Sequence, residues 1–298
     1  MRVSVLINNF NYAQYLGAAI DSALREDYAD VEVIVVDDGS TDNSRALIAA
    51  YGDRIVPVLK TNGGQASSFN AGFAASSGEI LFFLDADDAF LPGKLARVVA
   101  TYEKLDIDWC FDRVTTDEGA SPPVELVTTP IDRRDRLRRG GFPSLPVPTS
   151  GLSFRRAALA KILPMPEATD VVLSDNYLKF AGAYLGRGAV IETPLTFQRL
   201  HATNRYTGIG HGRTLKPRIM VETGLELARR YDELQRLGRS LVAGGLAEGG
   251  APPGQVWSEI RRCTRDGTFG ADGAARIAAL VAYKRLVSRF KPQPEALQ

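Results

Sequence analysis

The chain has 298 residues, a formal net charge of +1, 45% apolar residues and 24% charged residues, values typical of a globular protein. The balanced charge argues against a nucleic-acid-binding protein, and the length allows one large domain or one domain with an appendage. Cys110 and Cys263 lie far apart without a Cys or His at ligand spacing, which indicates a reducing compartment and no zinc site. No run approaches the roughly twenty apolar residues of a membrane span, and the first run is too short for a signal peptide, so we expect a cytoplasmic protein.

The first third of the chain alternates apolar runs of strand length with helical patterns. Parallel neighbours in a sheet need crossover connections, and helices between successive strands supply them. The alternation therefore predicts an α/β fold with a doubly wound, mainly parallel sheet. The predicted strands are residues 3–7, 31–36, 55–59 and 80–84, and the predicted helices are residues 13–25, a short helix around Leu47 and Ile48, and residues 66–75.

Polar loops follow all four of these strands, at residues 8–12, 37–40, 62–65 and 85–88. In an open parallel sheet, ligands bind beyond the carboxyl ends of the strands, so these loops are expected to meet at one edge. Several polar loops that converge on one edge predict a ligand pocket there.

The fourth loop concentrates negative charge, because the apolar run 80–84 leads directly into Asp85, Asp87 and Asp88. Three carboxylates at a strand end repel one another unless water or a cation neutralises them, and a divalent cation does so best. The alternative is a solvated turn that caps the helix starting near Leu91.

The middle of the chain is less regular. We expect one long connection, residues 115–148, with at most one short helix, because prolines and a basic cluster at residues 133–139 interrupt any period. The other predicted elements are helix 91–105, strand 109–114, strand 149–154, a helix ending before Pro164, helix 174–185 and strand 189–197.

From residue 213 onwards the composition shifts to helix formers, which predicts a helical C-terminal appendage with a linker at residues 244–254 and helices at 256–263 and 271–290. Residues 284–291 mix basic and apolar side chains. This mixture suits either a peripheral contact with a membrane surface or a packed amphipathic helix.

Four motifs together resemble the family-2 glycosyltransferases of the GT-A fold. They are Asn-Asn-Phe-Asn-Tyr at residues 8–12, Val-Val-Asp-Asp-Gly-Ser-Thr-Asp at 35–42, Asn-Gly-Gly-Gln at 62–65 and Leu-Asp-Ala-Asp-Asp at 84–88. The resemblance covers about the first two hundred residues. It implies a glycosyltransferase domain at residues 1–212, with a nucleotide-sugar-binding half at 1–105 and an acceptor half at 106–212, followed by the helical region 213–298.

The resemblance also implies site residues for the donor. Asp87 would bind Mn²⁺ or Mg²⁺ against the diphosphate of a UDP-, dTDP- or GDP-linked sugar, while Asp85 and Ala86 would contact the nucleotide sugar. Asp88 would bind metal or cap the next helix. The nucleobase would lie against Asn8, Phe10 and Asp38, and Gly64 would let the backbone approach the nucleotide in the same pocket.

On the acceptor side, inverting transfer needs a general base, which in the family is usually the Asp of a Glu-Asp pair that opens a helix. The corresponding pair here is Ser174-Asp175, so Asp175 is the expected base, with a helix-cap aspartate as the alternative. Residues 198–204 resemble the family's Arg-x-His segment, in which the His meets the metal or the diphosphate. This resemblance assigns His201 to the metal site.

The expected function is metal-dependent, inverting transfer of a sugar to an acceptor hydroxyl in polysaccharide or glycolipid synthesis, at the inner face of the membrane or in the cytoplasm. A non-catalytic nucleotide-sugar-binding module is the main alternative, because the Glu before Asp175 is absent. An aspartyl phosphatase would carry its Asp-x-Asp motif on the first strand rather than the fourth. A dinucleotide oxidoreductase would need Gly-x-Gly-x-x-Gly after the first strand, where residues 8–12 contain no glycine.

Overall fold

A computed structural model describes residues 1–121, 125–167, 172–202, 212–249, 252–270 and 272–289. The chain divides into two compact units. The first comprises Met1–Arg134 and Pro143–His201, and the second comprises Asp135–Phe142 and Ala202–Gln298. The expected domain limits at residues 105 and 212 stay predictions.

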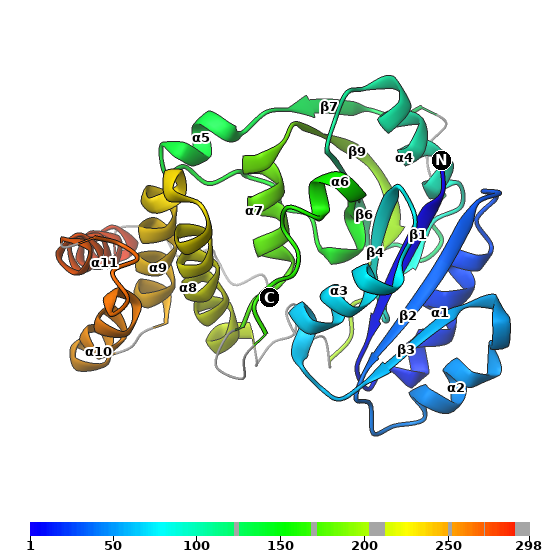
Figure 1. Cartoon of the computed structure of the whole chain (residues 1–298), viewed down its shortest axis with the longest axis horizontal. Helices are drawn as coiled ribbons and strands as arrows, with labels where there is room; N and C mark the ends of the chain where they lie inside the picture. Colours follow the sequence, from blue (N-terminus) through cyan, green and yellow to red (C-terminus); the bar gives the residue numbers. More distant parts are fainter. Residues whose placement is uncertain (122–124, 168–171, 203–211, 250–251, 271, 290–298) are drawn as a thin grey trace. The chain divides into compact units, whose positions relative to one another are not determined.

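The first unit is built on a sheet of nine strands in the order β3-β2-β1-β4-β8-β6-β9-β5, with β7 paired to β9 (Figure 1). Neighbours among the first four strands in this order are parallel, as are β6 and β9. The predicted α/β fold with a doubly wound, mainly parallel sheet is confirmed. These strands are β1 (Val3–Asn9), β2 (Val31–Asp38), β3 (Val56–Lys60), β4 (Ile80–Asp85), β6 (Trp109–Thr115) and β9 (Gly188–Phe197).

The remaining strands pair antiparallel with their neighbours: β5 (Ala89–Phe90) and β7 (Thr128–Ile131) with β9, and β8 (Leu152–Arg155) with both β4 and β6. Strand β7 lies within the stretch that the sequence predicted as a connection. Pro130 breaks the usual strand pattern, but β7 pairs only with β9, and an edge strand tolerates a residue that cannot donate to a ladder.

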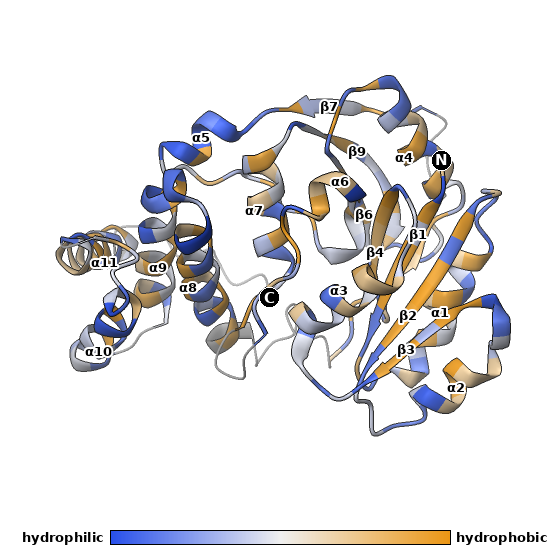
Figure 2. Ribbon diagram, viewed as in Figure 1, coloured by the Kyte–Doolittle hydropathy of each residue, from blue (hydrophilic) through white to orange (hydrophobic). Residues whose placement is uncertain are grey.

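Helices cover both faces of the first strands because side chains alternate along each strand. Val5 and Ile7 of β1 share a core with Ile20 of α1 and Leu95 of α4, whereas Leu6 faces Gly72 of α3. Figure 2 shows hydrophobic residues running along β1, β2 and β4. The helices of the first unit are α1 (Ala13–Leu24), α2 (Ser44–Ala50), α3 (Gly64–Ala75), α4 (Lys94–Lys104), α6 (Arg156–Leu159) and α7 (Asp175–Leu185), with short 3₁₀ turns η1 (Gly52–Arg54) and η2 (Thr149–Gly151).

The second unit is helical, as the composition predicted, but the linker expected at residues 244–254 is wrong in its first part. Helix α9 continues through Gly244 and Gly245 to Glu248. The glycines allow α8 and α9 to pack closely: a Cβ atom on Gly245 would lie 2.3 Å from the carbonyl oxygen of Pro217. The elements are α5 (Arg134–Arg138), α8 (Gly212–Arg230), η3 (Asp232–Leu234), α9 (Gln235–Glu248), α10 (Pro253–Thr264) and α11 (Gly273–Arg289). Among the described residues, no helix is both long enough and apolar enough to span a membrane.

One buried ion pair joins four elements of the first unit. Lys94 of α4 is fully buried, and its Nζ atom lies 2.8 Å from Oδ1 of Asp112 on β6. The same ammonium donates to the carbonyl oxygen of Ser150 in η2 at 2.7 Å and to Oγ1 of Thr196 on β9 at 2.6 Å. These bonds compensate the ammonium for the water that burial removes.

Lys94→Met is expected to lower the free energy of unfolding by about 3–5 kcal/mol, because Asp112 then carries a buried charge without its cation. Lys94→Met combined with Asp112→Leu removes both charges and should recover most of this loss. Urea denaturation measures the effect, with Lys104→Met at the exposed end of α4 as the control. Equal unfolding midpoints for Lys94→Met and Lys104→Met would contradict the importance of the pair.

Candidate functional site

The carboxyl ends of β1, β2 and β4 meet at one edge because β1 lies between the other two strands. Asn8 is in register with Asp85, and its Nδ2 atom donates to Oδ1 of Asp85 at 2.7 Å. Asn9 is in register with Asp37 and donates to Oδ2 of that carboxylate at 3.0 Å. The predicted convergence of these loops on one edge is therefore seen in side-chain contacts.

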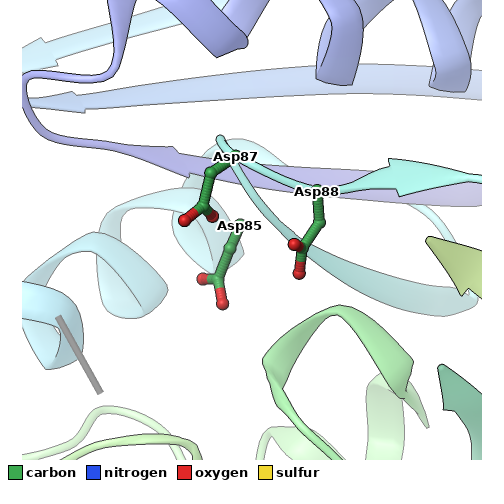
Figure 3. A group of neighbouring side chains, drawn as sticks. All are labelled: Asp85, Asp87 and Asp88. Carbon is green, nitrogen blue, oxygen red and sulfur yellow. The ribbon is translucent and has the colours of Figure 1, made fainter. Parts of the chain in front are cut away.

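Asp85, Asp87 and Asp88 form a compact acidic cluster where β4 ends. One carboxylate oxygen of each residue lies within 4.8 Å of those of the other two. Figure 3 shows the three carboxyl groups pointing to the same side of the turn that follows β4. Oxygen ligands at this spacing suit a hard divalent cation such as Mg²⁺ or Mn²⁺.

The electrostatics of this acidic cluster favour a cation. Burial, followed by the charges of Asp87 and Asp88, raises the pKa of Asp85 well above its ordinary value. Burial and the charge of Asp87 raise the pKa of Asp88 to about 7, against hydrogen bonds from Ser150 and Arg199 that lower it. Ionising Asp85 and Asp88 beside the charge of Asp87 is thus unfavourable without a compensating positive charge. The residues present therefore fit a divalent cation.

Asp88 does not cap the next helix, since α4 begins at Lys94 after Gly93. Its carboxylate instead accepts the Ser150 hydroxyl at 2.5 Å and the backbone N–H of Arg199 at 3.0 Å. The second bond ties the acidic turn to the segment after β9 that carries His201.

His201 lies beside the acidic cluster, with Nε2 at 3.1 Å from Oδ2 of Asp87. Its ring packs between the start of α1 and the acidic turn: the ring centroids of Tyr15 and Tyr12 lie 4.6 and 5.7 Å away. The two residues assigned to the metal from the sequence are thus brought together. Asn204 and His211 of the same region lie outside the described residues.

Asp175 is the first residue of α7, and Ser174 is the N-cap, with a hydroxyl that accepts the N–H of Asn176 at 3.3 Å. The cap alternative for Asp175 is therefore wrong. Besides burial and the charges of Asp87 and Asp88, the charge of Asp175 also raises the pKa of Asp85. The candidate base thus lies within electrostatic reach of the acidic cluster.

The residues expected around the nucleobase differ in how far their side chains are already hydrogen-bonded within the protein. Asp38 is buried, and its carboxylate accepts Lys60 Nζ at 2.7 Å and the N–H groups of Gly63 and Gly64 at 2.9 and 2.7 Å. Phe10 is 37% exposed on the loop after β1. In the described part of the chain, Oδ1 of Asn8 is buried without a hydrogen-bond partner, so it can accept one from a ligand.

Gly64 has a φ of +81°, and a Cβ atom built on it would meet nothing within 4 Å. The backbone there is thus open to a ligand, and the left-handed conformation favours glycine. The side chain of Ala86 is buried in the core, which leaves only its backbone for a ligand contact.

Sequence reasoning missed three residues that support the site: Lys94, Ser150 and Lys179. Ser150 is fully buried; it accepts the N–H of Asp85 at 3.0 Å and donates to Asp88. No motif marks it. Lys179 lies 2.8 Å from Asp175, and the four-residue spacing of opposite charges on one helix could have identified it.

The chain matches known proteins over most of its length. The profile described as glycosyl transferase family 2 matches residues 4–163, more than half of the chain. An uncharacterized glycosyltransferase of Nostoc sp. is 34% identical over 250 residues, which cover 80% of this chain and 77% of that relative.

Solved structures share the fold. A crystal structure of S. aureus TarS in complex with UDP-GlcNAc superposes with a TM-score of 0.66 at 16% identity, over 97% of this chain and 92% of that one. The mannosyltransferase PcManGT from Pyrobaculum calidifontis, in complex with GDP-Man and Mn²⁺, gives a TM-score of 0.52 at 17% identity, over 97% and 88% of the two chains. With the profile match and the Nostoc relative, these findings agree with the motifs at the strand ends: the chain belongs to glycosyltransferase family 2 and has the GT-A fold.

Proposed function

We propose that this glycosyltransferase moves a sugar from a nucleotide-diphosphate sugar to an acceptor hydroxyl, with a divalent cation and with inversion of the anomeric carbon. The observation that carries the proposal is the acidic cluster at the end of β4, with the charge of Asp175 within reach of Asp85. A donor site and a base on one edge are what a direct displacement requires.

The donor half of the proposal rests on Asp87 and His201 as ligands of Mn²⁺ or Mg²⁺, with Asp85 beside the nucleotide sugar. When bound, the cation would supply the positive charge that a departing diphosphate needs. TarS was solved with UDP-GlcNAc and PcManGT with GDP-Man and Mn²⁺, which supports a nucleotide-sugar donor here. We propose a UDP-, dTDP- or GDP-linked sugar.

The nucleotide would lie along the edge formed by β1 and β2. We assign the wall of the base pocket to Asn8 and Phe10, with the free Oδ1 of Asn8 as an acceptor for a ligand N–H or O–H. The carboxylate of Asp38 would accept a hydrogen bond from the nucleobase. It would also hold the turn at Gly64, since it already accepts a hydrogen bond from the backbone N–H of Gly64. The backbone of Ala86 completes this half of the site.

Asp175 acts as the general base in this proposal. The acceptor O–H proton passes to its carboxylate while the acceptor oxygen bonds to the anomeric carbon. The bond from that carbon to the diphosphate oxygen breaks on the opposite side, and the nucleoside diphosphate leaves with the electron pair. Attack opposite the leaving group inverts the configuration.

A nucleotide-sugar-binding module without catalysis is the second candidate, because Ser174 stands where relatives of the resembled family carry Glu. The two candidates differ in one measurable respect: only the enzyme releases nucleoside diphosphate from its donor.

For the acceptor, we propose a saccharide or lipid-linked saccharide of polysaccharide or glycolipid synthesis, met at a membrane surface through the C-terminal helices. Tyr283 is exposed on α11, as are Leu286 and Val287, which follow it by three and four residues and so lie about one turn further along the helix. Residues 290 and 291 lie outside the described part of the chain. Co-sedimentation with anionic lipid vesicles is expected and should weaken in Tyr283→Ser/Leu286→Ser. Equal binding by this variant and the parent would contradict the contact.

The donor is tested by thermal unfolding with UDP-GlcNAc, dTDP-glucose and GDP-Man, each with and without Mn²⁺. At least one donor should raise the melting temperature with Mn²⁺, by the equivalent of about 2.7 kcal/mol at a hundredfold excess over its Kd. Asp87→Asn should remove the Mn²⁺-dependent part, and the exposed Asp53→Asn should retain it. If no donor shifts the parent protein in the presence of Mn²⁺, the donor assignment fails. If a donor does shift the melting temperature, release of nucleoside diphosphate distinguishes the enzyme from the binding module.

Stability should also depend on pH in a direction set by the acidic cluster. In the metal-free fold the pKa of Asp88 is about 7, against 3.8 for an ordinary Asp, so the folded chain binds protons more tightly than the unfolded chain. The stabilising contribution of protonated Asp88 is complete below the pKa that Asp88 has in the unfolded chain. It is lost as the pH rises through the pKa that Asp88 has in the folded chain. With EDTA, the melting temperature should fall between about pH 5 and about pH 8.

Mn²⁺ competes with these protons, so it should raise the melting temperature more at the upper end of this pH range than at the lower end. Asp88→Asn should flatten the metal-free pH dependence, whereas Asp53→Asn should not. An unchanged slope in Asp88→Asn would show that the acidic cluster does not cause the effect.

A further inference from the structure

Lys179 lies one turn after Asp175 on the same face of α7. Its side chain is only 7% exposed, and its Nζ atom lies 2.8 Å from Oδ2 of Asp175. The same ammonium donates to the carbonyl oxygen of Val147 at 2.7 Å. The Lys179 ammonium is therefore held by groups from two parts of the chain, α7 and the segment before η2.

This arrangement leaves the two oxygens of Asp175 in different situations. Oδ2 faces the Lys179 ammonium, whereas no residue in the described part of the chain bonds Oδ1. Lysine side chains lose considerable rotamer freedom when they are ordered, and a buried ammonium needs compensating partners. Both contacts of Lys179 supply such compensation, and together they fix the orientation of the carboxylate.

We infer that Lys179 is a positioning residue for the transfer: its ammonium holds Oδ2 of Asp175 so that Oδ1 takes the proton of the acceptor hydroxyl. This inference rests on the proposed function, in which Asp175 is the base. The proton moves to Oδ1, the acceptor oxygen bonds to the anomeric carbon, and the diphosphate leaves with the electron pair of the broken bond.

The charges around Asp175 give the Lys179 ammonium a second effect. Asp175 bears a negative charge within electrostatic reach of Asp85. The positive charge of Lys179 reduces the repulsion between these two carboxylates. Ser174 provides the helix cap but no charge, so Lys179 is the charged neighbour that orients the base.

The test uses the full chain with Mn²⁺ and whichever of UDP-GlcNAc, dTDP-glucose and GDP-Man shifts its melting temperature. Nucleoside diphosphate release, with water as the acceptor, is measured for Asp175→Asn, Lys179→Met and the double variant. Lys104→Met is the matched control, since that lysine is exposed on α4. Asp175→Asn should lose about 10²- to 10⁴-fold in kcat.

Lys179→Met should lose about 10- to 100-fold in kcat through misplacement of the base, with the donor-induced melting shift in Mn²⁺ unchanged. Lys179→Arg should recover part of the rate, because it keeps a cation on the same helix face. In the Asp175→Asn background, Lys179→Met should have no further effect, since the carboxylate it orients is absent.

Two results would overturn the inference while the proposed function stands: kcat of Lys179→Met equal to that of Lys104→Met, or a further loss when Lys179→Met is added to Asp175→Asn. The double variant leaves no unpaired carboxylate, so this comparison stays decisive if Lys179→Met alone unfolds. A parent protein that releases no nucleoside diphosphate with any donor would instead refute the catalytic proposal.

Discussion

Repulsion between carboxylates gathered at one strand end is the constraint on which the rest of this structure depends. Asp85, Asp87 and Asp88 each place one carboxylate oxygen within 4.8 Å of the others, although burial and the neighbouring charges oppose the ionisation of Asp85 and Asp88. The sheet imposes this proximity, because β4 ends in register with Asn8 of β1 and the chain turns sharply after it. A site that concentrates negative charge in this way is poised to take up a cation and, with it, a diphosphate.

The acidic cluster is connected to the core by a continuous set of hydrogen bonds. Ser150 accepts from the backbone of Asp85 and donates to Asp88, while its own carbonyl oxygen accepts from Lys94 and Thr196. Asp88 in turn holds the backbone of Arg199, two residues before His201. The residues that support the fold thus also fix the positions of the groups that would bind the donor.

The sequence predicted those features that depend on local patterns. The alternation of strands and helices, the polar loops at the strand ends and the acidic turn all follow from periodicity and from the chemistry of Asp and Gly. Features that depend on tertiary packing could not be predicted in this way. Strand β7 forms because it pairs with the edge of β9. Helix α9 continues through Gly244 and Gly245 because α8 packs closely against it. Ser150 supports the site through hydrogen bonds to residues that are distant in the chain.

The central claim is that Asp85, Asp87 and Asp88 bind one divalent cation at the end of β4. The most direct measurement is a titration of the protein with Mn²⁺, followed through the electron paramagnetic resonance signal of the free ion. The account predicts that the parent chain removes one equivalent of Mn²⁺ from solution and that Asp85→Asn/Asp87→Asn leaves the ion free. Equal uptake by the parent and this double variant would contradict it.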